Sequence, residues 1–165
     1  AMLETLYSCG LRVSELVGLR FSDLFFEEGF IRVIGKGNKE RLVPVSPQVQ
    51  KEIDIYKQHI RNHLNIQKGS ENIVFLNRRG AQLTRVMVFT IIKNLAESIG
   101  LQKNISPHTF RHSFATHLIE GGANLRAIQE MLGHESITTT EIYTHLDQRF
   151  LRDAILSFHP RNAKA

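Results

Sequence analysis

The stretch Ser106-Pro107-His108-Thr109-Phe110-Arg111-His112 combines a helix start with a cluster of cationic and imidazole side chains. Serine followed by proline is a favoured pair at the first positions of a helix, and apolar residues continue the helical spacing to Gly121. His108 and Arg111 are three residues apart, so their side chains share a face near the helix start, where main-chain N–H groups attract anions. The stretch therefore predicts a helix whose first turns can bind a phosphate.

Apolar residues at helical spacing, with capping residues before them and glycines after them, predict further helices on both sides of this one. Thr84 is the expected cap of one, with Met87, Ile91, Leu95 and Ile99 as its buried stripe. A final helix over 149–158 ends before a proline. The other expected helices cover residues 2–9, 11–19, 47–64 (with a stripe of Val49, Ile53, Ile60 and Leu64) and 125–132, and a short helical stretch from Ser136 that includes Tyr143.

Two segments rich in β-branched and apolar residues, 30–34 and 41–45, predict a β-hairpin. The turn between them, residues 35–40, contains two glycines and places lysines at the hairpin tip. Residues 73–76 predict a further short strand. Because the chain has no internal repeat, low-complexity tract or linker, we expect residues 1–165 to form one domain that is mainly α-helical with a small antiparallel sheet.

Composition is that of a globular, mildly basic chain. Of 165 residues, 42% are hydrophobic and 22% charged, which is enough to support a core. The 21 Lys and Arg residues against 16 Asp and Glu give a net charge of +5, which favours a polyanionic partner. A single cysteine, Cys9, excludes an internal disulfide and is expected to pack in the core. Without a bilayer-length apolar run or a secretory signal, we expect no membrane association and a cytosolic location.

The most reactive candidates lie outside the expected hydrophobic stripes. Arg12 falls in a turn between two helices, Lys36 at the hairpin tip, and His134 just after a helix stop. Tyr143 follows nine residues later, and a phenol with a pKa of about 10 needs a base or a positive field to attack at neutral pH. Guanidinium and imidazole donors can hold the negative charge of a phosphate under attack by an oxygen nucleophile without a metal. Tyr7, by contrast, fits the apolar face of its helix and is expected to be structural.

At several separated motifs the sequence resembles the tyrosine recombinases, the lambda-integrase-like family, and within it the bacterial Xer chromosome-dimer resolvases. Order, residue types and spacing agree over nearly the whole chain. The matching motifs are Gly10-Leu11-Arg12-Val13-Ser14-Glu15-Leu16, Ile34-Gly35-Lys36-Gly37-Asn38-Lys39-Glu40-Arg41, His108-x-x-Arg111, Leu132-Gly133-His134 and Ile142-Tyr143-Thr144-His145. The resemblance implies the catalytic-domain fold of DNA breaking-rejoining enzymes.

The resemblance also implies a nucleophile and a phosphate clamp. Tyr143 is expected to attack a DNA phosphodiester, leaving a 3′-phosphotyrosine and a free 5′-hydroxyl. Arg12 and Arg111 are expected to clamp the non-bridging oxygens, because each can present a planar fork. Glu15 is expected to orient Arg12 rather than to react.

Three further residues are implied in proton transfer and phosphate contact. Lys36 is expected to protonate the leaving 5′ oxygen, and His108 to act as general acid-base with the tyrosine hydroxyl. His134 is expected to donate to the phosphate. No ATP, metal ion or other cofactor is implied.

Double-stranded DNA with a recombination site is the implied partner, and Lys39, Arg41 and Arg85 are expected to contact it. Family members carry an amino-terminal helical domain that completes a clamp around DNA. This chain begins in a helix without a cap, so we expect a catalytic domain cut from a larger protein, with weak DNA binding on its own. The segment 151–158 resembles a helix that members dock into a neighbouring subunit of a tetrameric complex, identical or paralogous. Alone, it can pack back on its own domain and give a monomer.

Several alternatives remain open on the sequence. Xer-type dimer resolution is preferred, but an integrase of a phage or mobile element, a type IB topoisomerase-like enzyme and a catalytically silent DNA-binding module use the same residues. Zinc binding by His108 and His112 is disfavoured, since no third ligand is suitably spaced. The other histidines, including His117 and His159, are expected at the surface or at helix caps.

Overall fold

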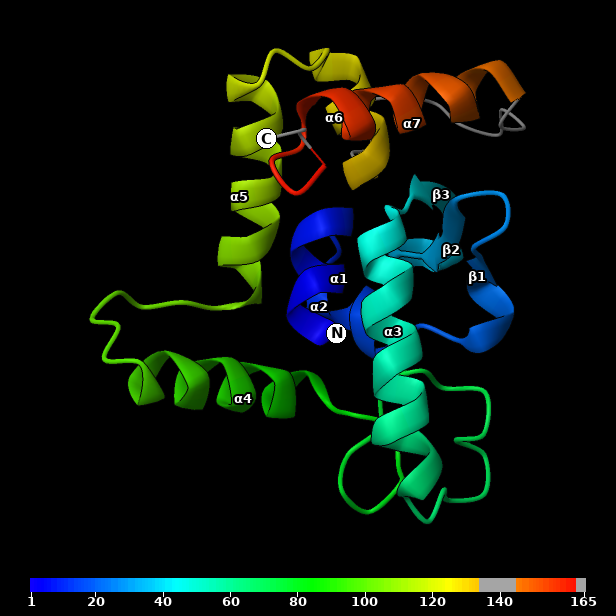
Figure 1. Ribbon diagram of the computed structural model, residues 1–165, viewed down its shortest axis with the longest axis vertical. Helices are drawn as coiled ribbons and strands as arrows, with labels where there is room; N and C mark the ends of the chain where they lie inside the picture. The colour runs from blue at the N-terminus through cyan, green and yellow to red at the C-terminus, as the bar shows by residue number, and fades with distance from the viewer. Residues whose placement is uncertain (134–144, 163–165) are drawn as a thin grey trace.

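The computed structural model describes residues 1–133 and 145–162, of which residues 145–148 are described by their main chain only. Helices dominate, and three strands form one antiparallel sheet in the order β1-β2-β3 (Figure 1). The predicted fold class, mainly α-helical with a small antiparallel sheet, is confirmed, although β1 was not among the expected strands. The helices are α1 Met2–Cys9, α2 Val13–Val17, α3 Pro47–His59, α4 Arg85–Ser98, α5 Pro107–Glu120, α6 Leu125–Leu132 and α7 His145–Phe158. The strands are β1 Leu24–Phe25, β2 Phe30–Ile34 and β3 Glu40–Pro44, and the short 3-10 helices are η1 Phe21–Asp23, η2 Lys36–Asn38 and η3 Arg61–His63.

The predicted hairpin is confirmed as β2 and β3. These strands pair from Phe30 opposite Pro44 to Ile34 opposite Glu40, and the connection passes through Gly37, whose φ of 72° suits a residue without a Cβ. Strand β1 pairs with the other edge of β2. Because side chains alternate along a strand, every second residue of the hairpin faces inward. The hairpin tip is therefore exposed while its base is fixed in the core.

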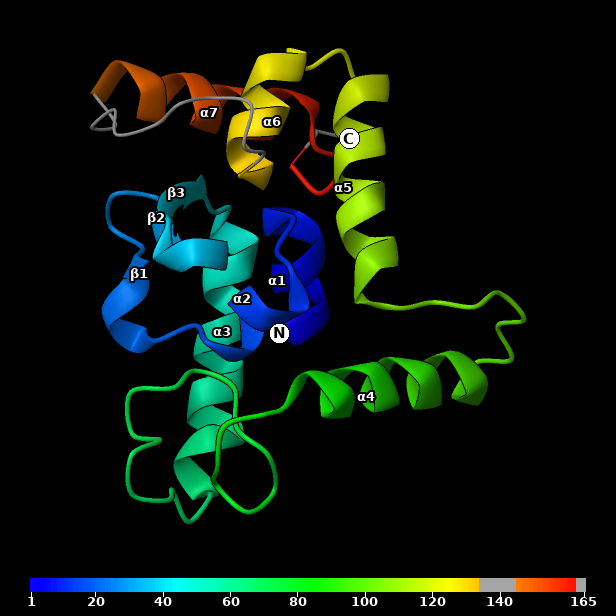
Figure 2. The same cartoon turned by 180° about the vertical axis from the view of Figure 1, so that it is seen from behind.

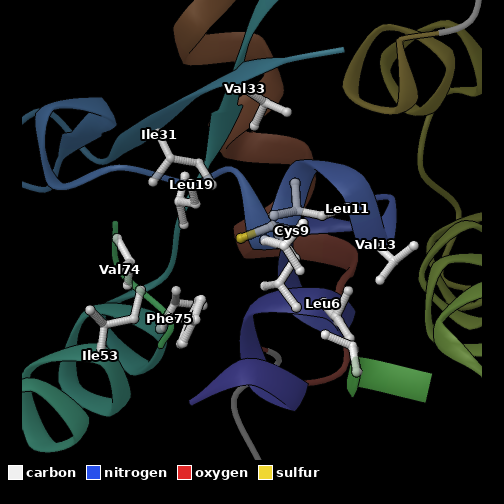
Figure 3. Close-up of a cluster of buried hydrophobic side chains, with 14 of the residues drawn as sticks. Leu6, Cys9, Leu11, Val13, Leu19, Ile31, Val33, Ile53, Val74 and Phe75 are labelled. Atoms are coloured by element: carbon white, nitrogen blue, oxygen red, sulfur yellow. The ribbon is translucent and has the colours of Figure 1, made fainter. Parts of the chain in front are cut away.

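Two hydrophobic clusters hold the molecule together. The larger lies among α1, α2, the sheet, α3 and α4, and Figure 3 shows part of it, with Leu6, Cys9 and Phe75 wholly or almost wholly buried. The expectation that Cys9 packs in the core is confirmed. The smaller cluster joins α5, α6 and α7 through residues such as Phe114 and Ile155. The two clusters meet where α1 packs against α5, which is also where the candidate site lies.

Gly10 fixes the approach of α1 to α5. It ends α1 in the left-handed conformation, at φ 63°. A Cβ at this position would lie 2.4 Å from Cδ1 of Phe114 on α5, so a larger residue cannot fit without a shift. The contact places the turn after α1, which carries Arg12, beside the first turns of α5 (Figure 2).

The first helix also contacts the end of the described chain. The hydroxyl of Tyr7 lies 2.7 Å from Nδ1 of His117 on α5, and its ring packs 4.6 Å, centroid to centroid, from that of His159. Glu4 forms an ion pair of 3.0 Å with Arg161. His159 directly follows the last residue of α7, and its main-chain N–H donates to the carbonyl of Ile155, which fits the expected helix-end position. It does not lie at the surface, because its side chain is wholly buried between α1 and α5.

Helix α7 packs on its own chain. Leu151, Ala154 and Ile155 are buried against α5 and α6, and α7 crosses above β3 in both views (Figures 1 and 2). Arg152 reaches the sheet side and donates a 3.4 Å hydrogen bond to the carbonyl of Glu28. The helix begins at His145, four residues before the expected start. The expectation that this segment can pack back on its own domain is confirmed.

The segment after α3 departs from the predictions. The helix ends at His59, and Ile60 is 55% exposed instead of buried. Residues 73–76 form isolated bridges rather than a strand. Buried Arg61 donates to the carbonyls of Ser70, Glu71 and Ile73, and the main-chain N–H of Leu76 donates to the hydroxyl of Tyr56 at 3.0 Å. Main-chain groups at both ends of the segment therefore bond to side chains instead of to a neighbouring strand.

Helix α4 is present as predicted, and the first half of its expected stripe, Met87 and Ile91, is partly buried against the core. Val88 and Ile92 are its buried residues, whereas Leu95 and Ile99 are exposed. The helix touches the rest of the molecule mainly through its first half and projects away from it (Figure 1). Within residues 1–133 and 145–162, every helix is too short or too polar to cross a bilayer.

Candidate active site

The site begins at the tight connection between α1 and α2, where Arg12 stands just before the first residue of α2. Its main-chain N–H donates a 2.8 Å hydrogen bond to Oε1 of Glu15, which satisfies one of the free donors at the helix start. Nη1 of Arg12 lies 3.9 Å from Oε2 of the same carboxylate, and 39% of the Arg12 side chain is exposed. Arg12 thus faces solvent from a fixed base, as expected for a group that holds an anion.

Glu15 is a buried carboxylate paired with Arg41 of β3. Both oxygens of Glu15 accept hydrogen bonds from Arg41, the Nη2 bond to Oε1 being 2.9 Å. Burial alone raises the pKa of the Glu15 carboxyl, but the hydrogen bond and charge of Arg41 outweigh it, so the pKa lies below its usual value. Glu15 is therefore ionised in the folded protein at neutral pH.

Arg111 joins the site from the first turns of α5. Its Nη1 donates to the carbonyl of Gly10 and its Nη2 to the carbonyl of Leu132, both at 2.6 Å. These carbonyls belong to the carboxyl ends of α1 and α6, where the helix dipole attracts a cation. Burial, followed by the positive charge of Arg12, lowers the pKa of Arg111 to about 10, while Glu15 acts in the opposite direction. Arg111 is still protonated at neutral pH.

Arg12 and Arg111 share one carboxylate. Nη1 of Arg111 lies 4.0 Å from Oε1 of Glu15, matching the 3.9 Å approach of Arg12 to Oε2. The structure thus brings together, at one carboxylate, two arginines that are far apart in sequence. We refer to Arg12, Glu15 and Arg111 as the arginine cradle.

Of the other candidate residues, the structure describes two, His108 and Lys36. His108 is exposed on α5, one turn before Arg111, with its ring 6.2 Å from that of Phe89. Lys36 is exposed at the hairpin tip. His134 and Tyr143 lie outside the described residues, so their expected roles remain predictions. The chain leaves the described region at Gly133, whose Cβ, were there one, would lie 3.1 Å from Cδ of Arg41.

The three residues expected to contact DNA differ in their exposure to solvent. Lys39 and Arg85 are exposed, at the hairpin tip and at the start of α4. The structure corrects the expectation for Arg41, whose side chain is only 6% exposed and is paired with Glu15. The reason is alternation along β3, where Arg41 faces the same way as Val43, two residues on. The alternation of inward-facing and outward-facing residues along this strand could have been recognised in the sequence.

Residues 1–149 match the phage integrase family. The chain belongs to the phage integrase family. Among curated members, tyrosine recombinase XerD of Chlorobaculum tepidum is 51% identical over 98% of this chain and 53% of its own length. Tyrosine recombinase XerD of Halalkalibacterium halodurans is 48% identical over 98% of this chain and 54% of its own. The chain thus spans about half the length of the curated integrase-family relatives it matches.

Solved structures of integrase-family proteins show the same fold. The XerA recombinase superposes with a TM-score of 0.72 at 34% identity, covering 96% of this chain and 57% of that one. The integrase from mycobacterium phage Brujita also gives a TM-score of 0.72, at 27% identity, covering 99% of this chain and 52% of that one. The fold predicted from the sequence, a tyrosine recombinase catalytic domain, is confirmed.

Proposed function

We propose that this chain is the catalytic domain of a site-specific DNA recombinase of the Xer type, which acts by transient attachment of DNA to Tyr143. The observation that carries the proposal is the arginine cradle, in which Arg12 and Arg111 approach one carboxylate at 3.9 and 4.0 Å. The identity of 51% with a tyrosine recombinase XerD supports the assignment to this class. As a catalytic domain it acts together with parts of the protein outside this chain.

The cradle supplies the electrostatics of the proposed reaction. A phosphodiester under attack gains negative charge on its non-bridging oxygens, and preorganised cations at those oxygens stabilise the transition state more than the ground state. Arg12 offers a partly exposed guanidinium, and Arg111 offers one whose position is fixed by two carbonyls. Fixing the donors in advance avoids reorganisation at the moment of reaction.

In the proposed cleavage step one bond forms, one bond breaks and two protons are transferred. The Oη of Tyr143 forms a bond to phosphorus while the bond from phosphorus to the 5′ oxygen breaks. His108 accepts the phenolic proton, Lys36 gives a proton to the leaving 5′ oxygen, and His134 donates a hydrogen bond to the phosphate. The products are a 3′-phosphotyrosine and a 5′-hydroxyl, and attack by another 5′-hydroxyl reverses the step and exchanges strands.

The proposed substrate is double-stranded DNA in the cytoplasm, bound by a tetramer in which pairs of strands are exchanged. Lys39 at the hairpin tip and Arg85 at the start of α4 are exposed cations that can contact its phosphates. Solved relatives include the XerH recombinase bound to its difH substrate, at 25% identity, covering 91% of this chain and 40% of that one. In the tetramer, α7 is the proposed contact between subunits.

Covalent trapping tests the proposal. Purified protein, with any preceding domain that its gene encodes, is mixed with lightly nicked genomic DNA of its host, so that a nick beside the cleavage site releases the leaving strand and prevents rejoining. We expect protein–DNA complexes that survive denaturation, and none from a Tyr143→Phe variant. Complexes that persist in the variant would remove Tyr143 from its role. Absence of complexes from the parent protein favours a DNA-binding module without catalysis.

A second candidate is an integrase of a phage or mobile element. It is favoured by the TM-score of 0.72 to the Brujita phage integrase, equal to that for XerA. Sequencing the DNA trapped above separates the two functions. A single chromosomal site supports dimer resolution, whereas junctions of a mobile element support integration. Relaxation of any supercoiled plasmid, without exchange between two sites, indicates a topoisomerase-like activity instead.

A further inference from the structure

Arg41 lies beneath the candidate site rather than on its surface. Its side chain points inward from β3, pairs with both oxygens of Glu15, and donates from Nε to the carbonyl of Met131 at 2.8 Å. All three guanidinium nitrogens are therefore engaged within the protein. Arg41 has no role in the proposed mechanism, yet it contacts the carboxylate on which the arginine cradle is built.

The pairing with Arg41 decides what Glu15 does to its other neighbours. Glu15 is within 4.0 Å of Arg12 and Arg111, but both distances exceed a hydrogen-bond length. A buried carboxylate that loses its partner is stabilised by pairing with another cation, because an uncompensated buried charge is costly. Without Arg41, Glu15 would take Arg12 as its direct partner, because both Nη atoms of Arg111 already donate to the carbonyls of Gly10 and Leu132. With Arg41 in place, those two guanidiniums remain available to an incoming anion.

Two glycines pack on the same ion pair, and each directly precedes a residue of the proposed mechanism. A Cβ at Gly35 would lie 3.2 Å from Oε2 of Glu15, and one at Gly133 would lie 3.1 Å from Cδ of Arg41. Gly35 precedes Lys36, and Gly133 ends α6 at φ 70° immediately before His134. The pair is thus a common support for the tip end of the hairpin and the end of α6.

We propose that Arg41 is a positioning residue, which saturates Glu15 so that Arg12 and Arg111 stay free for the scissile phosphate, and which ties the end of the hairpin next to its tip to the end of α6. This role rests on the function proposed above. It acts through other residues, since Arg41 is buried and does not reach a substrate.

The first test compares cleavage rates of Arg41 variants under single turnover with saturating protein, on the DNA recovered by trapping. Arg41→Met should slow covalent-complex formation by roughly 100-fold, as expected when reacting groups are misplaced by about 1 Å. Arg41→Lys, which keeps the charge but loses the fork, should lie between this variant and the parent. Adding Glu15→Gln to Arg41→Met should recover part of the loss, because a neutral amide competes less for Arg12 and Arg111.

Arg32→Met is the matched control. Arg32 lies on β2, the strand next to β3, and also pairs with a carboxylate, that of Asp23 at 2.8 Å. Its side chain is 36% exposed and is not part of the arginine cradle. Its removal should leave the cleavage rate within about twofold of the parent. Rates are compared at equal folded fraction, measured by circular dichroism. If Arg41→Met cleaves within about twofold of the parent, or if Glu15→Gln gives no recovery, the positioning role is overturned.

A second readout does not depend on catalysis. Phenylglyoxal modifies accessible guanidiniums, and mass spectrometry gives the rate at Arg12. Arg41→Met should slow modification of Arg12 severalfold, because Glu15 now holds it, and the Arg41→Met, Glu15→Gln double variant should restore the rate. An unchanged rate in Arg41→Met overturns the proposal. If the rates change as expected while the parent protein forms no covalent complex, the proposed recombinase activity fails and the role of Arg41 in the cradle stands.

Discussion

The carbonyl oxygen of Gly10 accepts a 2.6 Å hydrogen bond from Nη1 of Arg111. One end of α1 therefore holds a guanidinium that enters the site from α5. The same glycine lies so close to Phe114 that its conformation and the packing of the two helices are fixed together. Positioning of the cradle and cohesion of the two hydrophobic clusters consequently depend on one short turn.

Replacing Gly10 by alanine should therefore be costly. The left-handed φ disfavours alanine by about 1 to 2 kcal/mol, and crowding against Phe114 adds about 1 to 3 kcal/mol. Gly100→Ala is the matched control, since Gly100 has a similar φ of 69° with no atom within 4 Å of the added Cβ. Urea unfolding should show a loss of about 1 to 2 kcal/mol for the control and more for Gly10→Ala. Equal losses would contradict the packing role.

His159 should make stability depend on pH. Its pKa is lowered, first by burial and then by the charges of His117 and Arg161, against the opposing effects of the Tyr7 carbonyl and Glu4. The unfolded chain therefore binds a proton at higher pH than the folded one. The contribution of neutral His159 to the free energy of unfolding is complete above about pH 6.5. It is lost as the pH falls toward the lower pKa that His159 has in the folded protein.

Urea unfolding at about pH 7.5 and about pH 5.5 measures this effect, since the two values bracket the ordinary histidine pKa. His159→Gln should show a smaller stability difference between the two conditions than the parent protein. The exposed His63 provides a control, and His63→Gln should keep the parent's difference. A His159→Gln variant with the parent's full pH dependence would assign the titration to another group.

Arg61 should stabilise the loop that follows α3. It is 4% exposed, donates to the carbonyls of Ser70, Glu71 and Ile73, and stacks 4.6 Å above the ring of Phe21. Arg61→Met leaves buried carbonyls without donors and should cost about 3 kcal/mol.

Hydrogen exchange should then rise across residues 64–83 before it rises elsewhere. Arg78→Met, an exposed change in the same loop, should stay within about 0.5 kcal/mol of the parent. Uniform loss of protection over the whole chain in Arg61→Met would argue against a local role.

Chelation should leave covalent-complex formation unchanged. In the proposed mechanism, Arg12 and Arg111 supply the positive charge that opposes the phosphate, and guanidinium groups do not require a metal ion to act. The rate of trapping is measured with and without EDTA after exhaustive dialysis. Loss of cleavage in EDTA that Mg²⁺ restores would replace this account with metal-assisted chemistry.

Local patterns in the sequence predicted the hairpin, the caps of the helices and the cluster of His108 and Arg111. They predicted less well where a tertiary contact decides. Helix α4 buries Val88 and Ile92 because only one of its sides meets α2 and α5, and helical spacing alone does not say which side that is. Likewise, the side chains of Arg61 and Tyr56 bond to main-chain groups at the two ends of residues 73–76, where local propensity favoured a strand.

Motif spacing placed Arg12 and Arg111 in one site, but it gave the wrong environment for Arg41. A basic residue near a lysine-rich turn is normally solvated, and the prediction for Arg41 followed that rule. It neglected the alternation along the strand, which places Arg41 on the same face as the apolar Val43. The partner that makes burial possible, Glu15, lies 26 positions earlier on another element. Such a pair is recognised only when both the inward phase of the strand and the buried acid are considered together.

The contact of Tyr7 with His117 and His159 has a consequence for synthesis in the cell. Tyr7 is synthesised 110 residues before His117 and 152 residues before His159, so α1 precedes by far the residues that cover it. Contacts of such sequence separation close slowly, and incomplete chains expose apolar surface. The nascent α1 is therefore shielded by chaperones or by its own transient collapse until α5 and the residues after α7 have been synthesised.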